Sequence, residues 1–351
     1  MSSLLLYLGF ASFLTMHSLI FKKNVYFLLL TTSFFYALFY GLRVGIGNDY
    51  AQYENIYNQI NAGLYSAIEP TYIILSKLLS SFDNGFNILM ACYTFLTYIL
   101  CYVGIKKYNI YSYVPILMFS TGFIFYADNQ VRQALATAFF IYYMRFILSK
   151  ELWKYILCVA ISTVFLHFSS AVLIFAYLAP KKRIKSYIWF VLLILAFVLM
   201  KLDAVHTILI SIISHVPYYS ELYLQRFNDM VIISQGSGLG VIFWLVLAMF
   251  ILIYQYEIDE PLMVNLFIIG TIINVIFINY DIFERISFYL IYVRFILLSI
   301  IIKKIIFKDN LSFMLSAGVI AITLVFSSYE VMYDANKHGS VPLEFIYYRA
   351  G

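Results

Sequence analysis

Apolar runs of bilayer-crossing length recur from end to end of this chain, and they restrict its fold more than any other feature. A helix needs about 20 mainly apolar residues to cross the hydrocarbon core of a membrane. Of the 351 residues, 63% are hydrophobic and only 12% are charged, whereas soluble domains average about 25% charged residues. The mean hydropathy is +0.88. We therefore expect an all-α polytopic membrane protein that forms one integral membrane domain over residues 1–351.

The basic residues between the apolar runs predict the sidedness of the loops, because Lys and Arg are enriched in cytoplasmic loops. More than half of the 23 Lys and Arg residues fall in short basic loops, at 22–23, 106–107, 150–154, 181–185 and 303–308. Placing these loops inside gives ten full spans. The large outside segments are then 43–85 and 203–238, with an outside C-terminal tail at 329–351. An acidic turn at 257–260 is the misfit, because it falls on the inside.

One apolar piece, residues 155–179, does not fit simple alternation. A single crossing would leave the basic residues 181–185 outside, against the positive-inside rule. The parity is restored by a re-entrant helical hairpin bent around His167–Ser170, with two arms of about 12 residues that each reach about 18 Å. Broken helices at membrane depth are tolerated where they are buried in protein or line an aqueous cavity. This is the one break that the sequence pattern indicates, and it makes His167 a candidate site residue.

A polar cluster stands at the mouth of an otherwise apolar span. It consists of Asp128, Asn129, Gln130, Arg132 and Gln133. Charged side chains are costly in hydrocarbon, so such a cluster indicates a wet cavity and a functional site. The predicted topology places further charged residues on the same outside face, namely Arg43, Asp49, Glu69, His167, Arg226 and Arg285.

Each of these residues also has a structural interpretation. Arginines at span ends extend to lipid head groups, and a buried histidine is more often structural than catalytic. Asp49 lies in a Gly-rich turn, and Glu69 precedes Pro70 at a helix start, where the helix dipole favours an acid. Four arginines on one face still favour a polar pocket, because guanidinium groups bind phosphate bidentately and stay charged. A pyrophosphate-bearing ligand is therefore predicted, and Tyr50 is placed to stack on sugar rings.

Other classes of site find no support in the sequence. The net charge of +5 is spread over short loops, so it does not indicate nucleic-acid binding. The cysteines Cys92, Cys101 and Cys158 lie in apolar runs without metal-ligand spacing, which is typical of buried hydrophobic residues. We expect no metal and no cofactor. Arg294 lies inside a span with no evident partner at helical spacing.

Five motifs occur in order along the chain, near span ends. They are GLRVGIGNDYAQY, EPTYIILSKLL, VRQALATAFF, FLHFSSAVL and FERISFYL. Together they resemble the EpsG-like family of polysaccharide polymerases, the group that includes many Wzy-type O-antigen polymerases, over residues from about 43 to 289. The resemblance implies a GT-C-like membrane glycosyltransferase in the bacterial inner membrane. It would act on undecaprenyl-pyrophosphate-linked repeat units at the periplasmic face, in lipopolysaccharide or exopolysaccharide biosynthesis.

This chemistry assigns roles to the candidate residues. The arginines hold the pyrophosphate leaving group and stabilise its developing charge, while Asp49 or His167 accepts the proton of the acceptor hydroxyl. The expected catalytic residues are Asp49, Arg132 and His167. The expected substrate-binding residues are Arg43, Tyr50, Glu69, Arg226, Arg285 and Tyr289. Membrane lipids and a chain-length regulator are the further partners that we expect.

Two other functions remain open at this point. A flippase or transporter of the same lipid-linked oligosaccharide would also use a basic cavity, but it would have pseudo-symmetric halves with matched broken helices. A membrane acyltransferase that modifies the polysaccharide would use a histidine within the membrane, but it would leave the arginines without a purpose. Loss of a polymerase leaves single repeat units, loss of a flippase leaves none, and loss of an acyltransferase leaves chain length unchanged.

Overall fold

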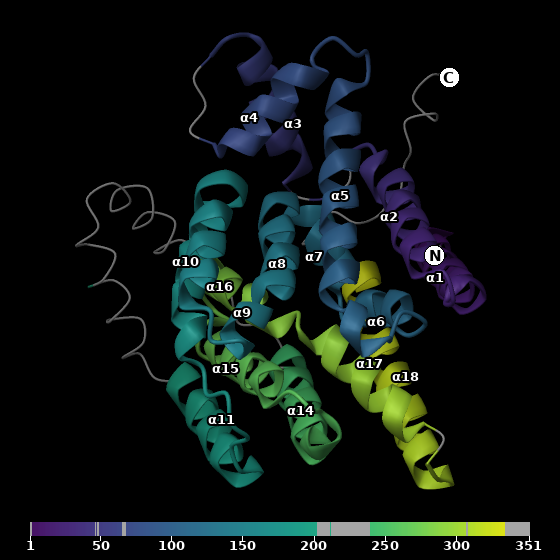
Figure 1. The fold of residues 1–351 in the computed structure, drawn as a ribbon, viewed down its shortest axis with the longest axis vertical. Coiled ribbons are helices and arrows are strands. Elements are labelled where there is room, and N and C mark those ends of the chain that lie inside the picture. Colours follow the sequence, from purple (N-terminus) through teal and green to yellow (C-terminus); the bar gives the residue numbers. More distant parts are fainter. Residues whose placement is uncertain are drawn as a thin grey trace. The chain divides into compact units, whose positions relative to one another are not determined.

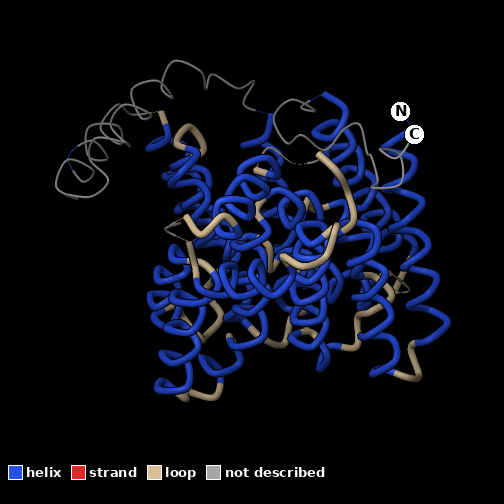
Figure 2. Tube along the Cα trace, turned by 90° about the horizontal axis from the view of Figure 1, so that it is seen from above, coloured by secondary structure: helices blue, strands red, loops and turns tan. Residues whose placement is uncertain are grey.

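The computed structural model describes residues 2–45, 47, 49–64, 68–201, 211, 239–306 and 308–333. These residues form helices joined by short loops and contain no strand (Figure 2), which confirms the all-α class for the described part of the chain. The chain divides into two compact units, one of Met1–Tyr177 with Arg294–Gly351 and one of Leu178–Val293. Nearly all of the expected outside segment 203–238, and residues 334–351 of the tail, lie outside the described residues.

The first unit is a helical bundle in which α5 packs against α2, α4 and α8 (Figure 1). Its N-terminal helices are α1 (Ser2–Phe21), α2 (Val25–Gly41), α3 (Tyr50–Asn61), α4 (Pro70–Leu79), α5 (Gly85–Gly104) and η1 (Lys106–Tyr108). They are followed by α6 (Val114–Ser120), α7 (Phe123–Asn129), α8 (Val131–Tyr143) and α9 (Arg145–Leu148). The unit is completed by α10 (Leu152–Ile161), η2 (Ser162–Leu166), η3 (Phe168–Leu178), α17 (Arg294–Ile305) and α18 (Asn310–Tyr333).

Two glycines allow the helices around α5 to pack closely. A Cβ atom on Gly41 of α2 would lie 2.2 Å from the Cα atom of Ala91 on α5. A Cβ atom on Gly104 of α5 would lie 2.8 Å from the Cγ2 atom of Ile141 on α8. Small residues at such contacts let helix backbones approach each other within a membrane. The close packing fixes the ends of α2 and α8, where the candidate residues lie.

The short helices α3 and α4 lie together beside the first turns of α5 (Figure 1). With 12 and 10 residues, they reach only about 18 and 15 Å and are too short to cross a bilayer, as predicted for the segment around α4. An aromatic cluster holds them on α5, and its buried members include Tyr53, Tyr57, Tyr72, Phe86 and Tyr93. The Tyr72 hydroxyl donates to the Tyr53 carbonyl at 2.8 Å, which ties α4 to α3.

The predicted hairpin around His167 is present. The π-helical turn η2 follows α10, and His167 then has an extended backbone (φ −161°, ψ 122°) before the 3₁₀ helix η3 begins. The two arms lie side by side, because the hydroxyl of Tyr155 near the start donates to the Leu173 carbonyl. The Tyr155 ring also contacts the Tyr177 ring, with centroids 5.4 Å apart. The chain therefore reverses at His167, which leaves this side chain at the bend.

A second break, which the sequence did not indicate, separates α6 from α7. Gly122 has a left-handed backbone (φ +74°) that favours glycine. Two side chains from the C-terminal helices bind the carbonyls at the break. Arg294 of α17 donates to the Thr121 carbonyl, and Ser327 of α18 donates to the Ser120 carbonyl at 2.6 Å. The expectation of a single break was wrong, because these distant donors satisfy the carbonyls, and the contact gives Arg294 its partner.

In the first unit, loops that were predicted on the same side lie together. Lys106 Nζ donates to the Tyr26 hydroxyl at 3.1 Å, and Lys303 Nζ donates to the carbonyls of Tyr108 and Asn109, both at 3.0 Å. Four helical segments have the length and composition of a membrane span: Leu4–Phe21, Gly85–Gly104, Phe283–Ile305 and Asn310–Tyr329. Shorter apolar helices accompany them. The count of ten spans and the GT-C-like arrangement remain predictions.

The second unit contains α11 (Ser186–Met200), α14 (Leu239–Ile253), η4 (Gln255–Glu257), α15 (Pro261–Phe277) and α16 (Asp281–Ile291). Within it, Asn265 of α15 donates to the Pro180 carbonyl at 2.6 Å and to the Lys182 carbonyl at 2.9 Å. Arg183 donates to the Ile258 carbonyl at 2.7 Å, so the basic turn lies beside the acidic turn 257–260. This neighbour explains how an acidic turn fits on the side predicted to be inside.

Candidate functional site

Three of the predicted site residues meet at one carboxylate in the first unit. The Oε2 atom of Glu69 forms an ion pair with Nη1 of Arg132. The Oε1 atom lies 2.9 Å from Nδ1 of His167 and accepts the backbone N–H of Phe168 at 3.2 Å. Arg132 and His167 are 63 and 98 positions from Glu69 in the sequence. We call Glu69, Arg132 and His167 the Glu69 cluster.

The cluster forms where three helix ends come together. Glu69 precedes α4 with an extended backbone (φ −63°, ψ 143°), because Pro70 begins the helix. Arg132 lies in the first turn of α8, directly after the kink at Gln130 (φ −112°, ψ 58°). His167 follows η2, and both α4 and α8 pack against η2. Each side chain therefore projects from a helix terminus that packing holds in place.

The protonation of the cluster follows from its contacts. Burial raises the pKa of Glu69, but the hydrogen bond from His167 and the charge of Arg132 outweigh burial and lower this pKa to about 2. An ionised carboxylate only accepts hydrogen bonds, so Nδ1 of His167 donates to it. The His167 side chain is 24% exposed and Glu69 only 9%. Among the described residues, none forms a hydrogen bond with Nε2 of His167.

Arg132 has an unused donor. Its guanidinium carbon lies 5.3 Å from the centroid of the Tyr53 ring, and Nη1 binds Glu69. Its Nε atom is buried and has no hydrogen-bond partner among the described residues. Leaving a buried donor unsatisfied costs about 1–3 kcal/mol, and more for a charged group. A phosphate oxygen would satisfy it, because guanidinium groups bind phosphate through pairs of parallel N–H bonds.

A second ion pair lies fully inside the first unit. Arg43 donates through Nη1 to Oδ1 of Asp128, and through Nη2 to the Asp128 carbonyl. It also donates to the Tyr40 carbonyl at 2.6 Å. Its side chain is 1% exposed and that of Asp128 is 4% exposed. The guanidinium thus binds the C-terminal end of α7, where helix carbonyls lack internal partners.

The loop between Arg43 and α3 is held against the same end of α7. The backbone N–H of Asp49 donates to Oδ1 of Asn129 at 3.1 Å. Gly47 has φ +101°, and a Cβ atom there would lie 3.4 Å from the Asp128 carbonyl oxygen. The buried Tyr50 donates its hydroxyl to the Arg43 carbonyl at 3.4 Å. Asp49 is thereby placed, half-buried, at the start of α3.

Comparison with known proteins adds the family. The model of the EpsG family matches residues 26–345 of this chain. The chain belongs to the EpsG family. This is a family of Wzy-like, exopolysaccharide polymerase-type membrane proteins. No curated protein and no solved structure matches the chain.

The remaining predicted residues of this EpsG protein lie apart from the Glu69 cluster in the sequence. Arg285 and Tyr289 are on α16 in the second unit, where Tyr289 is fully buried. On the same helix, Oε1 of Glu284 accepts from Nδ2 of the buried Asn274 at 3.1 Å. Arg226 lies outside the described residues.

Sequence reasoning did not assign a role to two residues that position the EpsG site. Asp128 and Asn129 were recognised as part of a polar cluster, but neither was proposed as a partner of the Arg43 loop. The available signal was their place next to Gln130 and Arg132 at a span mouth. Their partners, Arg43 and Asp49, are 85 and 80 positions away in the sequence, and sequence patterns carry little information at that range.

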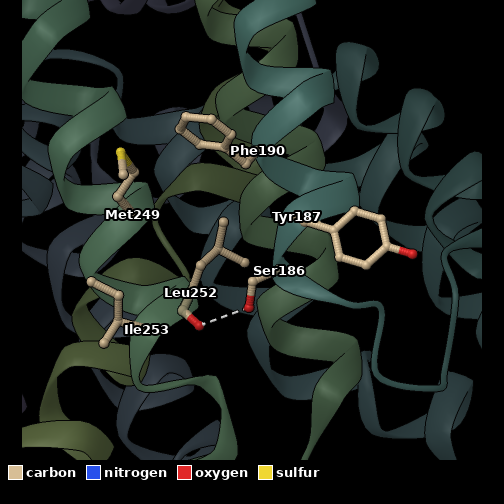
Figure 3. Close-up of a pocket in the computed structure, with 6 residues that line it drawn as sticks. All are labelled: Ser186, Tyr187, Phe190, Met249, Leu252 and Ile253. Carbon is tan, nitrogen blue, oxygen red and sulfur yellow. Dashed lines mark hydrogen bonds between the residues drawn. The ribbon is translucent and has the colours of Figure 1, made fainter.

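The second unit of this EpsG protein also contains an open pocket of about 230 Å³ between α11 and α14 (Figure 3). It is lined by Ser186, Tyr187, Phe190, Met249, Leu252 and Ile253. The Ser186 hydroxyl donates to the Leu252 carbonyl at 3.3 Å. No charged side chain lines the pocket, so it lacks the groups that a pyrophosphate ligand would need.

Proposed function

We propose that this EpsG protein is a membrane glycosyltransferase that polymerises undecaprenyl-pyrophosphate-linked oligosaccharide repeat units at the periplasmic face of the bacterial inner membrane. Membership of the EpsG family supports the polymerase class. The observation that best supports the chemistry is the shared carboxylate of Glu69, which holds a guanidinium and an imidazole next to each other. Phosphate recognition and proton transfer are thus available in one cluster.

In this proposal, Arg132 binds the pyrophosphate of the donor. Its buried Nε atom is free to donate to a phosphate oxygen, and its positive charge stabilises the leaving group as the bond to the anomeric carbon breaks. Arg226 and Arg285 remain predicted substrate-binding residues. Arg43 acts differently, because Asp128 already binds its buried guanidinium, and we assign it to holding the loop that carries Asp49 and Tyr50.

The base that we propose is His167. Its Nε2 atom takes the proton of the acceptor hydroxyl while the hydroxyl oxygen bonds to the anomeric carbon of the donor. The bond between that carbon and the pyrophosphate oxygen breaks, and the leaving pyrophosphate keeps the electron pair. Asp49 is the second candidate base. His167 is preferred because it shares Glu69 with Arg132, so the base and the leaving-group ligand are adjacent.

The competing functions fit the described residues less well. An inverted-repeat transporter places broken helices at corresponding positions in its two halves. Within the described residues, the breaks at Gly122 and His167 both belong to the first unit. An acyltransferase would use His167 but would give no role to the free donor of Arg132.

The proposal is tested in a strain that lacks the gene and carries plasmid-borne variants. R132A and H167A should insert into the membrane normally but yield single capped repeat units and no long chains. R145A is the matched control, because Arg145 stacks on Tyr142 at 4.0 Å beyond the other end of α8 and should give the wild-type ladder. Long-chain polymer from both site variants would refute the assignment. Absence of all repeat units would indicate a flippase, and unchanged length would indicate an acyltransferase.

A further inference from the structure

One carboxylate serves two different partners in the Glu69 cluster. The Oε2 atom of Glu69 is bound to Arg132, and the Oε1 atom accepts from His167 Nδ1 and from the Phe168 backbone N–H. Glu69 is 9% exposed, so its charge is poorly screened by solvent. A change in the ion pair between Glu69 and Arg132 will therefore affect His167.

A pyrophosphate ligand would compete with Glu69 for Arg132. The Glu69 carboxylate neutralises the Arg132 guanidinium through Nη1. A bound diphosphate would bring further negative charge to the same guanidinium, and like charges only a few ångströms apart repel strongly where solvent is limited. The other carboxylate oxygen, Oε1, is held independently of Arg132 by two donors on the hairpin. The carboxylate can thus leave Arg132 without losing all of its hydrogen bonds.

From this geometry, and resting on the proposed function, we propose that Glu69 is a positioning residue that couples donor binding to base activation. The donor pyrophosphate replaces Glu69 on Arg132, and the released carboxylate then pairs with His167 alone. There it stabilises the imidazolium that forms when Nε2 takes the proton of the acceptor hydroxyl. The consequence is an ordered reaction in which the donor binds before the acceptor is deprotonated.

We call this replacement of Glu69 by the donor pyrophosphate on Arg132 the exchange. It makes a specific prediction for the variant E69Q. Glutamine keeps an oxygen that can accept from His167 and Phe168, but it removes the negative charge that competes for Arg132. The variant should bind undecaprenyl pyrophosphate about fivefold or more tightly than the wild type. At the same time it should transfer glycan at least about 100-fold more slowly, since the imidazolium loses its carboxylate. A merely structural role would weaken binding and transfer together.

Binding is measured on the purified full-length protein in detergent, with undecaprenyl pyrophosphate as the probe. Transfer is measured as polymer formed from lipid-linked repeat units extracted from the polymerase-deficient strain. The gain in affinity of E69Q should disappear when R132A is added, because it depends on the released guanidinium. E151Q is the matched control, since Glu151 pairs with Lys154 on an exposed turn and should change neither quantity.

The outcomes separate the two proposals. If R132A binds undecaprenyl pyrophosphate as tightly as the wild type, the proposed function fails. If R132A binds weakly and E69Q also binds weakly, only the exchange fails. Tighter binding by E69Q with a normal transfer rate would likewise overturn the exchange. Should E69Q not fold, E69D keeps the charge and should bind within about twofold of the wild type while transferring more slowly, and a gain in its affinity would overturn the exchange.

Discussion

The buried pair of Arg43 and Asp128 should behave as one unit in stability measurements. D128A removes the carboxylate from a guanidinium that is 1% exposed. Nη2 keeps the backbone carbonyl of residue 128, and Nη1 keeps the Tyr40 carbonyl at 2.6 Å. Breaking a buried ion pair from one side costs about 3–5 kcal/mol, because the remaining charge stays uncompensated. R43M should also destabilise the protein, because it removes the partner of the buried Asp128 carboxyl group and of the Tyr40 carbonyl.

The double variant R43M/D128A leaves no buried charge at this position. Its free energy of unfolding should therefore exceed, by about 2 kcal/mol, the value expected from adding the two single effects. The measurement is unfolding of the purified protein in mixed micelles with increasing sodium dodecyl sulfate, followed by far-ultraviolet ellipticity. E151A is the control, because the Glu151 and Lys154 side chains are 37% and 65% exposed, and such pairs contribute about 1 kcal/mol or less.

Two results would refute this reasoning. A cost below about 1 kcal/mol for D128A would show that the charge of Arg43 finds other compensation. Additive effects, within about 0.5 kcal/mol, would show that the two side chains do not stabilise the fold through each other. Either result would also weaken the role given to Arg43 in holding the loop before α3.

Two further predictions use the same unfolding assay. G41A should lower the free energy of unfolding by about 1–3 kcal/mol, because its Cβ would lie 2.2 Å from the Ala91 backbone. The control G9A places no atom within 4 Å of the added Cβ and should not be destabilised. Equal effects of the two variants would contradict the close packing of α2 on α5. Because the pKa of Glu69 falls from 4.5 to about 2 on folding, its stabilisation, about 3 kcal/mol, is complete above pH of about 5 and is lost as the pH falls toward 2. In E69Q the free energy of unfolding should lose this part of its dependence on pH. An unchanged profile of unfolding free energy against pH would refute the stabilising role of the Glu69 carboxylate.

Much of the fold could be predicted because it depends on local composition. Apolar runs identify helices wherever they occur, since the transfer of an apolar side chain into lipid does not require a particular partner. The hairpin at His167 followed from the need to keep residues 181–185 on the inside, and the chain does reverse there. The break at Gly122 was not foreseen, because it is stabilised by Arg294 and Ser327, which are 173 and 207 positions from their acceptors.

The site was predictable as a set of residues and not as a set of contacts. Charged residues at span ends drew attention to Arg43, Arg132 and His167, and the sequence suggested that both arginines share one role in binding pyrophosphate. In the structure, Arg43 binds Asp128 in the interior, while Arg132 binds Glu69 with a free donor. The difference arises from burial at each helix end, which depends on how α3 and α4 pack on α5.

The sequence by itself determined that this chain is helical and apolar enough for a membrane, and it predicted which of its loops share a side. These properties follow from the cost of placing each residue in lipid or water, which is set by the residue and its near neighbours. Only the tertiary structure decided which charges meet, because the energy of an ion pair depends on the distance and burial that helix packing creates. Glu69, Arg132 and His167 lie in separate motifs of the chain. They are in contact only because the starts of α4 and α8 and the end of η2 lie together.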